Sequence, residues 1–176
     1  MNRVQDITET TWLKASDGSQ LEVGPLLPAR LEELFWLFTD IVARYEGFPQ
    51  LPPLTRAVFE ETWVRPVTVV VGALREGQLA GAYYLKPNQP GLGAHIANAG
   101  YVVARGLRGL GIGRALVEDS VPRASVAGYD ALQFNFVFAD NPARSLYEEL
   151  GWREIGRVPQ GAGPGRDALI YWRSLR

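Results

Sequence analysis

The sequence YVVARGLRGLGIGRA, residues 101–115, decides the fold. It begins with an apolar strand-like run, passes through a loop that holds four glycines, and becomes helical near Ile112. The start of a helix carries unpaired N–H groups and the positive end of the peptide dipole. A glycine-rich approach to a helix is therefore typical of a phosphate or pyrophosphate site. Arg105, Arg108 and Arg114 add fixed positive charge around this loop.

The spacing of the glycines separates this loop from two other phosphate loops. A P-loop ends in Gly-Lys-Ser/Thr, whereas the two lysines of this chain, Lys14 and Lys86, lie elsewhere. Gly109-x-Gly111-x-Gly113 also lacks the Gly-x-Gly-x-x-Gly spacing of dinucleotide-binding folds. A lone glycine-rich loop is often a plain surface turn, so the downstream sequence has to decide.

Composition limits the classes of function. The 176 residues suit a single domain, 1–176, whose first 19 residues are either an arm or a short edge strand near Thr11. A net charge of −1 argues against a nucleic-acid partner. The chain has no cysteine and one histidine, His95, which excludes a thiol nucleophile and a multi-histidine metal centre, so we expect no metal. It shows neither a signal peptide nor an apolar run of membrane-spanning length, so we expect no membrane partner and a cytoplasmic location.

Periodicity and turn signals predict an alternating order of helices and strands. Helices are expected over 31–45, 55–63 and 141–150, and another from 112 that kinks or ends early at Pro122. Strands are expected over 20–26, 67–74, 79–85, 95–104, 131–139, 153–158 and 168–175. This order predicts a mixed α/β sheet.

Two motifs carry a family resemblance. Arg108-x-x-Gly111-x-Gly113 is similar to the Arg/Gln-x-x-Gly-x-Gly/Ala loop of the GNAT superfamily of N-acetyltransferases. The segment ADNPARSLYEELGW, residues 139–152, resembles the part of that family in which a strand ends at Asn and a helix with a Leu-Tyr pair closes at Gly-Trp. The two motifs lie roughly thirty residues apart, as the family's strand–helix–strand unit requires.

The resemblance implies the GNAT fold: an α/β, mostly antiparallel mixed sheet, flanked by helices, with a central parallel pair of strands that splay apart. In this family the loop amides hold the pyrophosphate of acetyl-CoA, and its amide arm completes the ladder of the splayed strand. The residues expected to bind this cosubstrate are Tyr101, Val102, Val103, Arg108, Gly109, Leu110, Gly111, Ile112, Gly113, Arg114, Asn141 and Arg144. Asn141 has a plain alternative role as a helix cap.

The same resemblance suggests catalytic roles. Tyr147 is the candidate proton donor to the departing thiolate, with a core tyrosine as the alternative. The amide of Val103 is the candidate that polarises the carbonyl. Many relatives carry a glutamate before the loop, and residues 94–104 have none. His95 and Glu46 are therefore the candidates for the base, or the amine loses its proton to water.

The acceptor is predicted from two asparagines. HIANAGYVV and FNFVFADN are similar to a GNAT branch that acetylates small amino or imino acids, which implies that Asn98 and Asn135 line the acceptor pocket. Asn135 would orient the amine. The alternative is that the two asparagines bond each other or a water, since a buried, unpaired amide costs roughly 1–3 kcal/mol. The strands carry no cluster of carboxylates, which disfavours polyamines and aminoglycosides.

We therefore expect direct transfer of an acetyl group from acetyl-CoA to the amine of a small molecule, in a ternary complex. Two alternatives stay open: acetylation of a protein N-terminus, and a CoA-binding regulatory module without turnover. Homodimers are common in the family, so a homodimer is compatible with the resemblance.

Overall fold

A computed structural model describes residues 6–65 and 67–176. Its elements follow the chain as β1 (Thr11–Lys14), β2 (Gln20–Pro25), η1 (Pro28–Arg30), α1 (Leu31–Ala43), α2 (Arg56–Trp63), β3 (Val69–Arg75), β4 (Gln78–Pro87), η2 (Gly91–Gly93), β5 (Ile96–Val103), η3 (Arg105–Leu107), α3 (Ile112–Val126), β6 (Ala131–Phe138), α4 (Arg144–Glu149), β7 (Arg153–Val158) and β8 (Ala168–Ser174). The expected start of the chain resolves as a paired edge strand from Thr11, and residues 1–5 of the expected arm lie outside the described residues.

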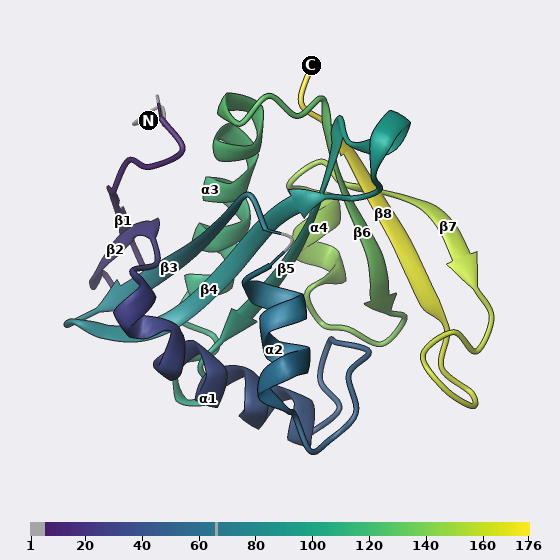
Figure 1. Cartoon of the computed structure of the whole chain (residues 1–176), viewed down its shortest axis with the longest axis horizontal. Helices are drawn as coiled ribbons and strands as arrows, with labels where there is room; N and C mark the ends of the chain where they lie inside the picture. Colours follow the sequence, from purple (N-terminus) through teal and green to yellow (C-terminus); the bar gives the residue numbers. More distant parts are fainter. Residues whose placement is uncertain (1–5, 66) are drawn as a thin grey trace.

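The strands form one eight-stranded sheet in the order β1-β2-β3-β4-β5-β6-β8-β7 (Figure 1). Every neighbouring pair is antiparallel except β5 and β6, which run parallel. The predicted mixed sheet with one central parallel pair is confirmed. The tight turn between β3 and β4 is also confirmed, at Glu76 and Gly77, whose φ angles of 52° and 77° suit a hairpin turn.

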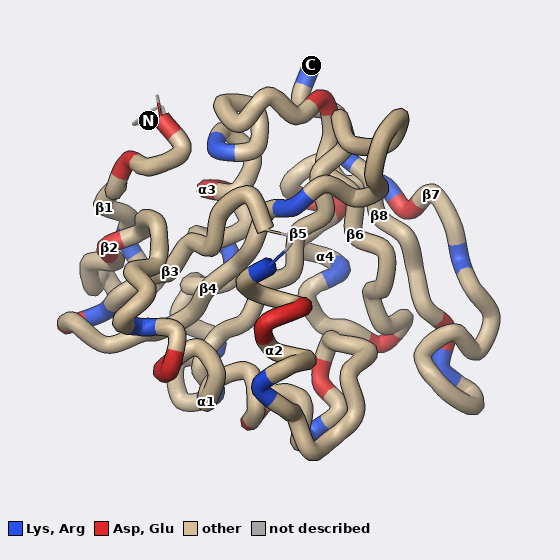
Figure 2. The backbone as a smooth tube through the Cα atoms, in the orientation of Figure 1, with Lys and Arg blue, Asp and Glu red and all other residues tan. Residues whose placement is uncertain are grey.

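Helices cover both faces of this sheet (Figure 1). The apolar stripe of α1, predicted from its spacing, is buried, and with α2 it packs on one face around Phe38, Trp63 and Tyr84. Helices α3 and α4 cover the other face, around Leu116 and Tyr147. The sheet therefore separates two compartments of the core, one under α1 and α2 and the other under α3 and α4. Acidic and basic residues are interspersed along the fold, in keeping with the near-zero net charge (Figure 2).

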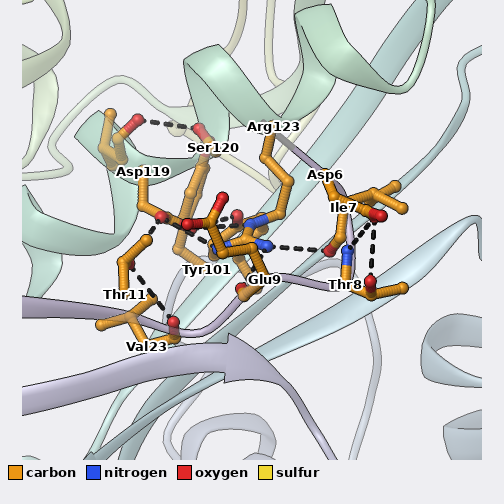
Figure 3. A network of polar contacts seen from close by, with 12 residues as sticks. Asp6, Ile7, Thr8, Glu9, Thr11, Val23, Tyr101, Asp119, Ser120 and Arg123 are labelled. Carbon is orange, nitrogen blue, oxygen red and sulfur yellow. Dashed lines mark hydrogen bonds and ion pairs between the residues drawn. The ribbon is translucent and has the colours of Figure 1, made fainter. Parts of the chain in front are cut away.

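A buried polar network fastens the N-terminal segment to α3 (Figure 3). Arg123 is 0% exposed and donates to both carboxylate oxygens of Asp119, at 3.0 and 3.1 Å. It also donates to the carbonyls of Ile7 and Glu9, at 2.8 and 2.9 Å. The Tyr83 hydroxyl donates to Asp119 at 2.6 Å. All five donors of such a guanidinium need partners when buried, and this network supplies most of them.

Two boundaries differ from the sequence expectation by three residues or more. Of the two outcomes expected at Pro122, a kink or an early end, the early end is wrong, because α3 continues to Val126. A proline costs the helix one backbone bond, and the buried network of Arg123, one residue further on, holds the following turn in place. The last helix begins at Arg144 rather than Asn141, because Pro142 and Ala143 form a turn before it.

The helices of the described residues are all too short or too polar to cross a membrane. Within the same residues, histidine, aspartate and glutamate side chains form no group of three or more that could hold a metal ion.

Candidate active site

The parallel strands β5 and β6 pair over a short length and then separate. Their register covers three pairs, ending at Asn98 opposite Gln133. Beyond that point β5 stays paired with β4 as far as Val103, and β6 stays paired with β8. The edges that face each other across the splay consequently lack ladder partners. An extended ligand with its own amide groups can complete them.

A cavity of about 860 Å³ occupies this splay and connects the two faces of the sheet. On one side it reaches the glycine loop, the first turn of α3 and Tyr147. On the other side it is bounded by α2 and by the loop between α1 and α2, including Phe48 and Gln50. A volume of this size is typical of a pocket for a small ligand. The cavity is therefore lined by residues from both compartments of the core.

The glycine loop has the geometry of an anion cradle. Gly111 precedes α3 with a left-handed φ of 78°, and no side chain caps the helix start, so its first N–H groups remain available. A Cβ on Gly109 would meet nothing within 4 Å, and one on Gly113 would meet only Val103 Cγ2, at 3.7 Å. Backbone that is bare on this side fits a pyrophosphate. The residues present therefore fit acetyl-CoA.

The other side of the loop is packed against the N-terminal hairpin. The Ser16 amide donates to the Leu110 carbonyl at 2.8 Å. A Cβ on Gly111 would lie 3.1 Å from the Ser16 nitrogen. Leu110 and Gly111 therefore shape the loop rather than line the cavity, which the glycine pattern alone could not distinguish.

Eight of the residues expected to bind acetyl-CoA line the cavity: Tyr101, Val102, Val103, Arg108, Gly109, Ile112, Gly113 and Asn141. Arg114 and Arg144 do not. Arg114 pairs with Glu149 at 2.6 Å and with Glu118 at 3.5 Å. Arg144 donates to the Ala139 carbonyl at 2.8 Å and to the Tyr171 hydroxyl at 3.1 Å, so it secures the start of α4.

Tyr147 lines the cavity from α4 and is 8% exposed. Its ring packs 4.9 Å from that of Phe134 and 5.9 Å from that of Tyr171. Among the described residues its hydroxyl has no hydrogen-bond partner. Burial, and then the neighbouring Tyr171, raise the pKa of Tyr147 to about 12, so the phenol stays protonated at neutral pH. It is therefore a free hydrogen-bond donor that faces the reaction space.

Neither predicted base has suitable surroundings. His95 is exposed, its Nδ1 lies 2.9 Å from the Leu92 carbonyl, and it does not line the cavity, because it precedes β5 at the end remote from the glycine loop. Glu46 does line the cavity but pairs with Arg108 at 2.6 Å and Arg44 at 3.1 Å. The hydrogen bond from Arg108 is the main cause that lowers the pKa of Glu46, which makes it a weaker base.

The three predicted asparagines line the cavity with different partners. Asn98 is buried, accepts from the Tyr84 hydroxyl at 3.2 Å and donates to the Gln133 carbonyl at 3.0 Å. Asn141 accepts from the Ala143 amide at 2.9 Å, which is a local capping contact and leaves its amide nitrogen available. Neither asparagine bonds Asn135.

Asn135 is exposed, not buried as expected from its apolar strand. The register of β6 against β8 shifts between Phe134 and Val137, so the strand is irregular at this residue. The Asn135 amide donates to Asn88 at 2.6 Å and accepts from Gln133 at 2.8 Å. It forms part of a polar wall at the mouth of the cavity.

Sequence reasoning missed two groups on the acceptor side. Gln50 donates to Thr62 at 3.2 Å, while its buried Oε1 has no partner among the described residues. Lys86 lies on β4 directly opposite Asn98. Lys86 follows Tyr84 by two residues, and side chains two residues apart in a strand lie on the same face of the sheet. This spacing could have identified Lys86 from the sequence.

A bare glycine loop before a helix, beside a splayed pair of parallel strands, is an arrangement that fits acetyl-CoA. The model of the Acetyltransferase (GNAT) family matches residues 30–152, and the chain belongs to this family of N-acetyltransferases, whose cosubstrate is acetyl-CoA.

Individual relatives agree with this assignment. The chain is similar to N-acetyltransferase aca1 of Schizosaccharomyces pombe, with 40% identity over 99 residues, which cover 53% of this chain and 47% of the relative. It thus spans about half the length of that curated relative. A GCN5-related N-acetyltransferase from Kribbella flavida has a TM-score of 0.81 and 32% identity over 88% of this chain and 97% of its own. The acetyltransferase yncA from Salmonella typhimurium, solved with acetyl-CoA, shares the fold with a TM-score of 0.78, 16% identity and coverage of 89% and 94%.

Proposed function

We propose that this protein transfers the acetyl group of acetyl-CoA directly to the amine of a small amino or imino acid. The observation that carries the proposal is the single cavity that joins the glycine loop and Tyr147 to a compartment beneath the α1–α2 loop. Two substrates that enter from opposite faces of the sheet can meet there without a covalent enzyme intermediate. Holding them together contributes to the rate by alignment.

The acceptor compartment supports a small substrate. Phe48 and Pro49 in the α1–α2 loop line it on one side, and Asn135, which donates a hydrogen bond to Asn88 just after β4, lines it on another. A compartment bounded in this way suits an amino acid better than a peptide chain, which needs an open groove. The carboxylates of Glu46 and Asp140 are paired with arginines, and Glu61 on the same wall is exposed and solvated by water, so the cavity offers no cluster of carboxylates to attract a polyamine.

The residues of this chain divide the chemistry between them. When bound, acetyl-CoA supplies an activated thioester carbonyl. The backbone amide of Val103 is proposed to donate to the carbonyl oxygen as negative charge develops on it. Tyr147 is proposed to donate its hydrogen bond to the departing sulfur, since its hydroxyl has no competing partner among the described residues. With His95 remote and Glu46 paired, we assign the loss of the amine proton to water.

The proposal is tested by following thiol release from acetyl-CoA with a panel of L-amino acids, L-proline, polyamines and short peptides, and by detecting the acetylated products. We expect turnover with amino or imino acids. Turnover confined to peptides would establish N-terminal acetylation instead. Tight binding of CoA without turnover of any amine would favour a regulatory module.

A further inference from the structure

The charged side chains on the cavity wall are mostly paired with one another. Glu46 pairs with Arg108, and Asp140 pairs with Arg166 at 2.9 Å. Two charges are left without an ion-pair partner among the described residues, Lys86 and Glu61. Glu61 is exposed, so water solvates it. Lys86 is partly buried, so the lack of a counter-ion bears on it more heavily.

The surroundings of Lys86 stabilise its charge only weakly. Its Nζ lies 4.6 Å from the centroid of the Tyr84 ring, a cation–π contact, and Asn98 is its neighbour across the β4–β5 ladder. Burial lowers the pKa of Lys86, because partial loss of water disfavours the ammonium and no carboxylate compensates for it. A carboxylate supplied by a ligand would stabilise the ammonium of Lys86.

The position of Lys86 in the sheet indicates which ligand could supply it. Lys86 shares a face with Tyr84, which packs in the α1–α2 compartment, whereas Tyr147 and the first turn of α3 belong to the opposite compartment. The phosphates of the cosubstrate are expected at the glycine loop, which follows Val103, at the other end of β5 from Asn98, the ladder partner of Lys86. The ligand that reaches Lys86 is therefore the acceptor.

We propose that Lys86 binds the carboxylate of the acceptor and so selects amino or imino acids with a free carboxylate over amines that lack one. This inference rests on the proposed function and refines it. The ammonium attracts an acid and repels a polyamine, and the neighbouring asparagines on the wall add neutral hydrogen-bonding groups. Lys86 is thus a specificity residue and takes no part in bond making or breaking.

The test uses the amino acid of the panel that has the highest kcat/KM. Its kinetics are compared with those of the carboxamide of the same amino acid. In wild-type enzyme the carboxamide should have a KM about 10- to 100-fold higher, the effect of losing one charge-assisted hydrogen bond. Lys86→Gln should raise the KM of the amino acid by the same factor, leave that of the carboxamide within about two-fold, and leave the KM of acetyl-CoA unchanged. Lys86→Arg should recover most of the affinity. Lys14→Gln, at the only other lysine, which is exposed on β1, is the matched control.

The outcomes separate this inference from the proposed function. If amino acids turn over but Lys86→Gln affects amino acid and carboxamide equally, the role of Lys86 is refuted and the function stands. If polyamines or peptides alone turn over, both are refuted. A third outcome combines two results: mass spectrometry shows that acetyl-CoA acetylates Lys86 itself, and Lys86→Gln leaves the kinetics with amino acids unchanged. In that case Lys86 is an acceptor and the inference is refuted.

Discussion

Tyr147→Phe removes one oxygen atom from the cavity wall and leaves the ring in place. The ring contacts with Phe134 and Tyr171 are kept, and the lost hydroxyl has no hydrogen-bond partner among the described residues. Folding should therefore change by less than about 0.5 kcal/mol, since no buried group loses a partner. The loss of a proton or hydrogen-bond donor to the leaving sulfur should lower kcat by about 100-fold, equivalent to about 2.7 kcal/mol of transition-state stabilisation.

The assay measures kcat and both KM values by thiol release, together with stability by urea denaturation. Tyr171→Phe is the matched control, because its hydroxyl donates to Glu148 at 2.8 Å and accepts from Arg144 at 3.1 Å and does not line the cavity. This control should lose about 1–2 kcal/mol of stability and keep kcat within about three-fold. Wild-type kcat in Tyr147→Phe, or equal losses of kcat in both variants, would refute the assignment of Tyr147.

Three further predictions concern pH, the loop and the buried network. The kcat with saturating acceptor should rise with pH as the bound amine becomes neutral, and Tyr147 should cause no fall below about pH 11, because its raised pKa of about 12 keeps it protonated; a decline near neutrality would contradict this. Gly111→Ala should weaken acetyl-CoA binding in calorimetry and destabilise the fold by about 1–2 kcal/mol, since φ is 78° and the new Cβ would approach Ser16; unchanged affinity would argue against the cradle. Arg123→Met should lower the free energy of unfolding by about 3–5 kcal/mol, because Asp119 would remain buried without its partner; a loss below about 1 kcal/mol would contradict that account.

Elements that depend on the backbone preferences of neighbouring residues could be predicted from the sequence. The left-handed glycine ahead of α3 and the run Tyr101–Val103 fixed a strand, a loop and a helix start at their correct places. The valine-rich run before the turn at Glu76 and Gly77 predicted a hairpin for the same reason. Together these elements determine the parallel pair and hence the opening between β5 and β6.

Features that depend on tertiary contacts could not be predicted. Pro122 weakens its helix locally, and only the buried partners of Arg123 reveal why α3 continues. Asn135 bonds Asn88, 47 residues away in sequence, a contact that no local pattern indicates. The ion pair of Arg114 with Glu149, 35 residues further on, is likewise a tertiary contact that the loop sequence does not indicate.

Amide hydrogen exchange with and without CoA tests the central claim most directly, because it reports where the cosubstrate lies without requiring turnover. The account predicts strong protection of residues 99–103 at the splayed edge of β5 and of residues 108–114 in the glycine loop, and no change in β1 and β2. Binding of CoA that leaves both segments unprotected would contradict it.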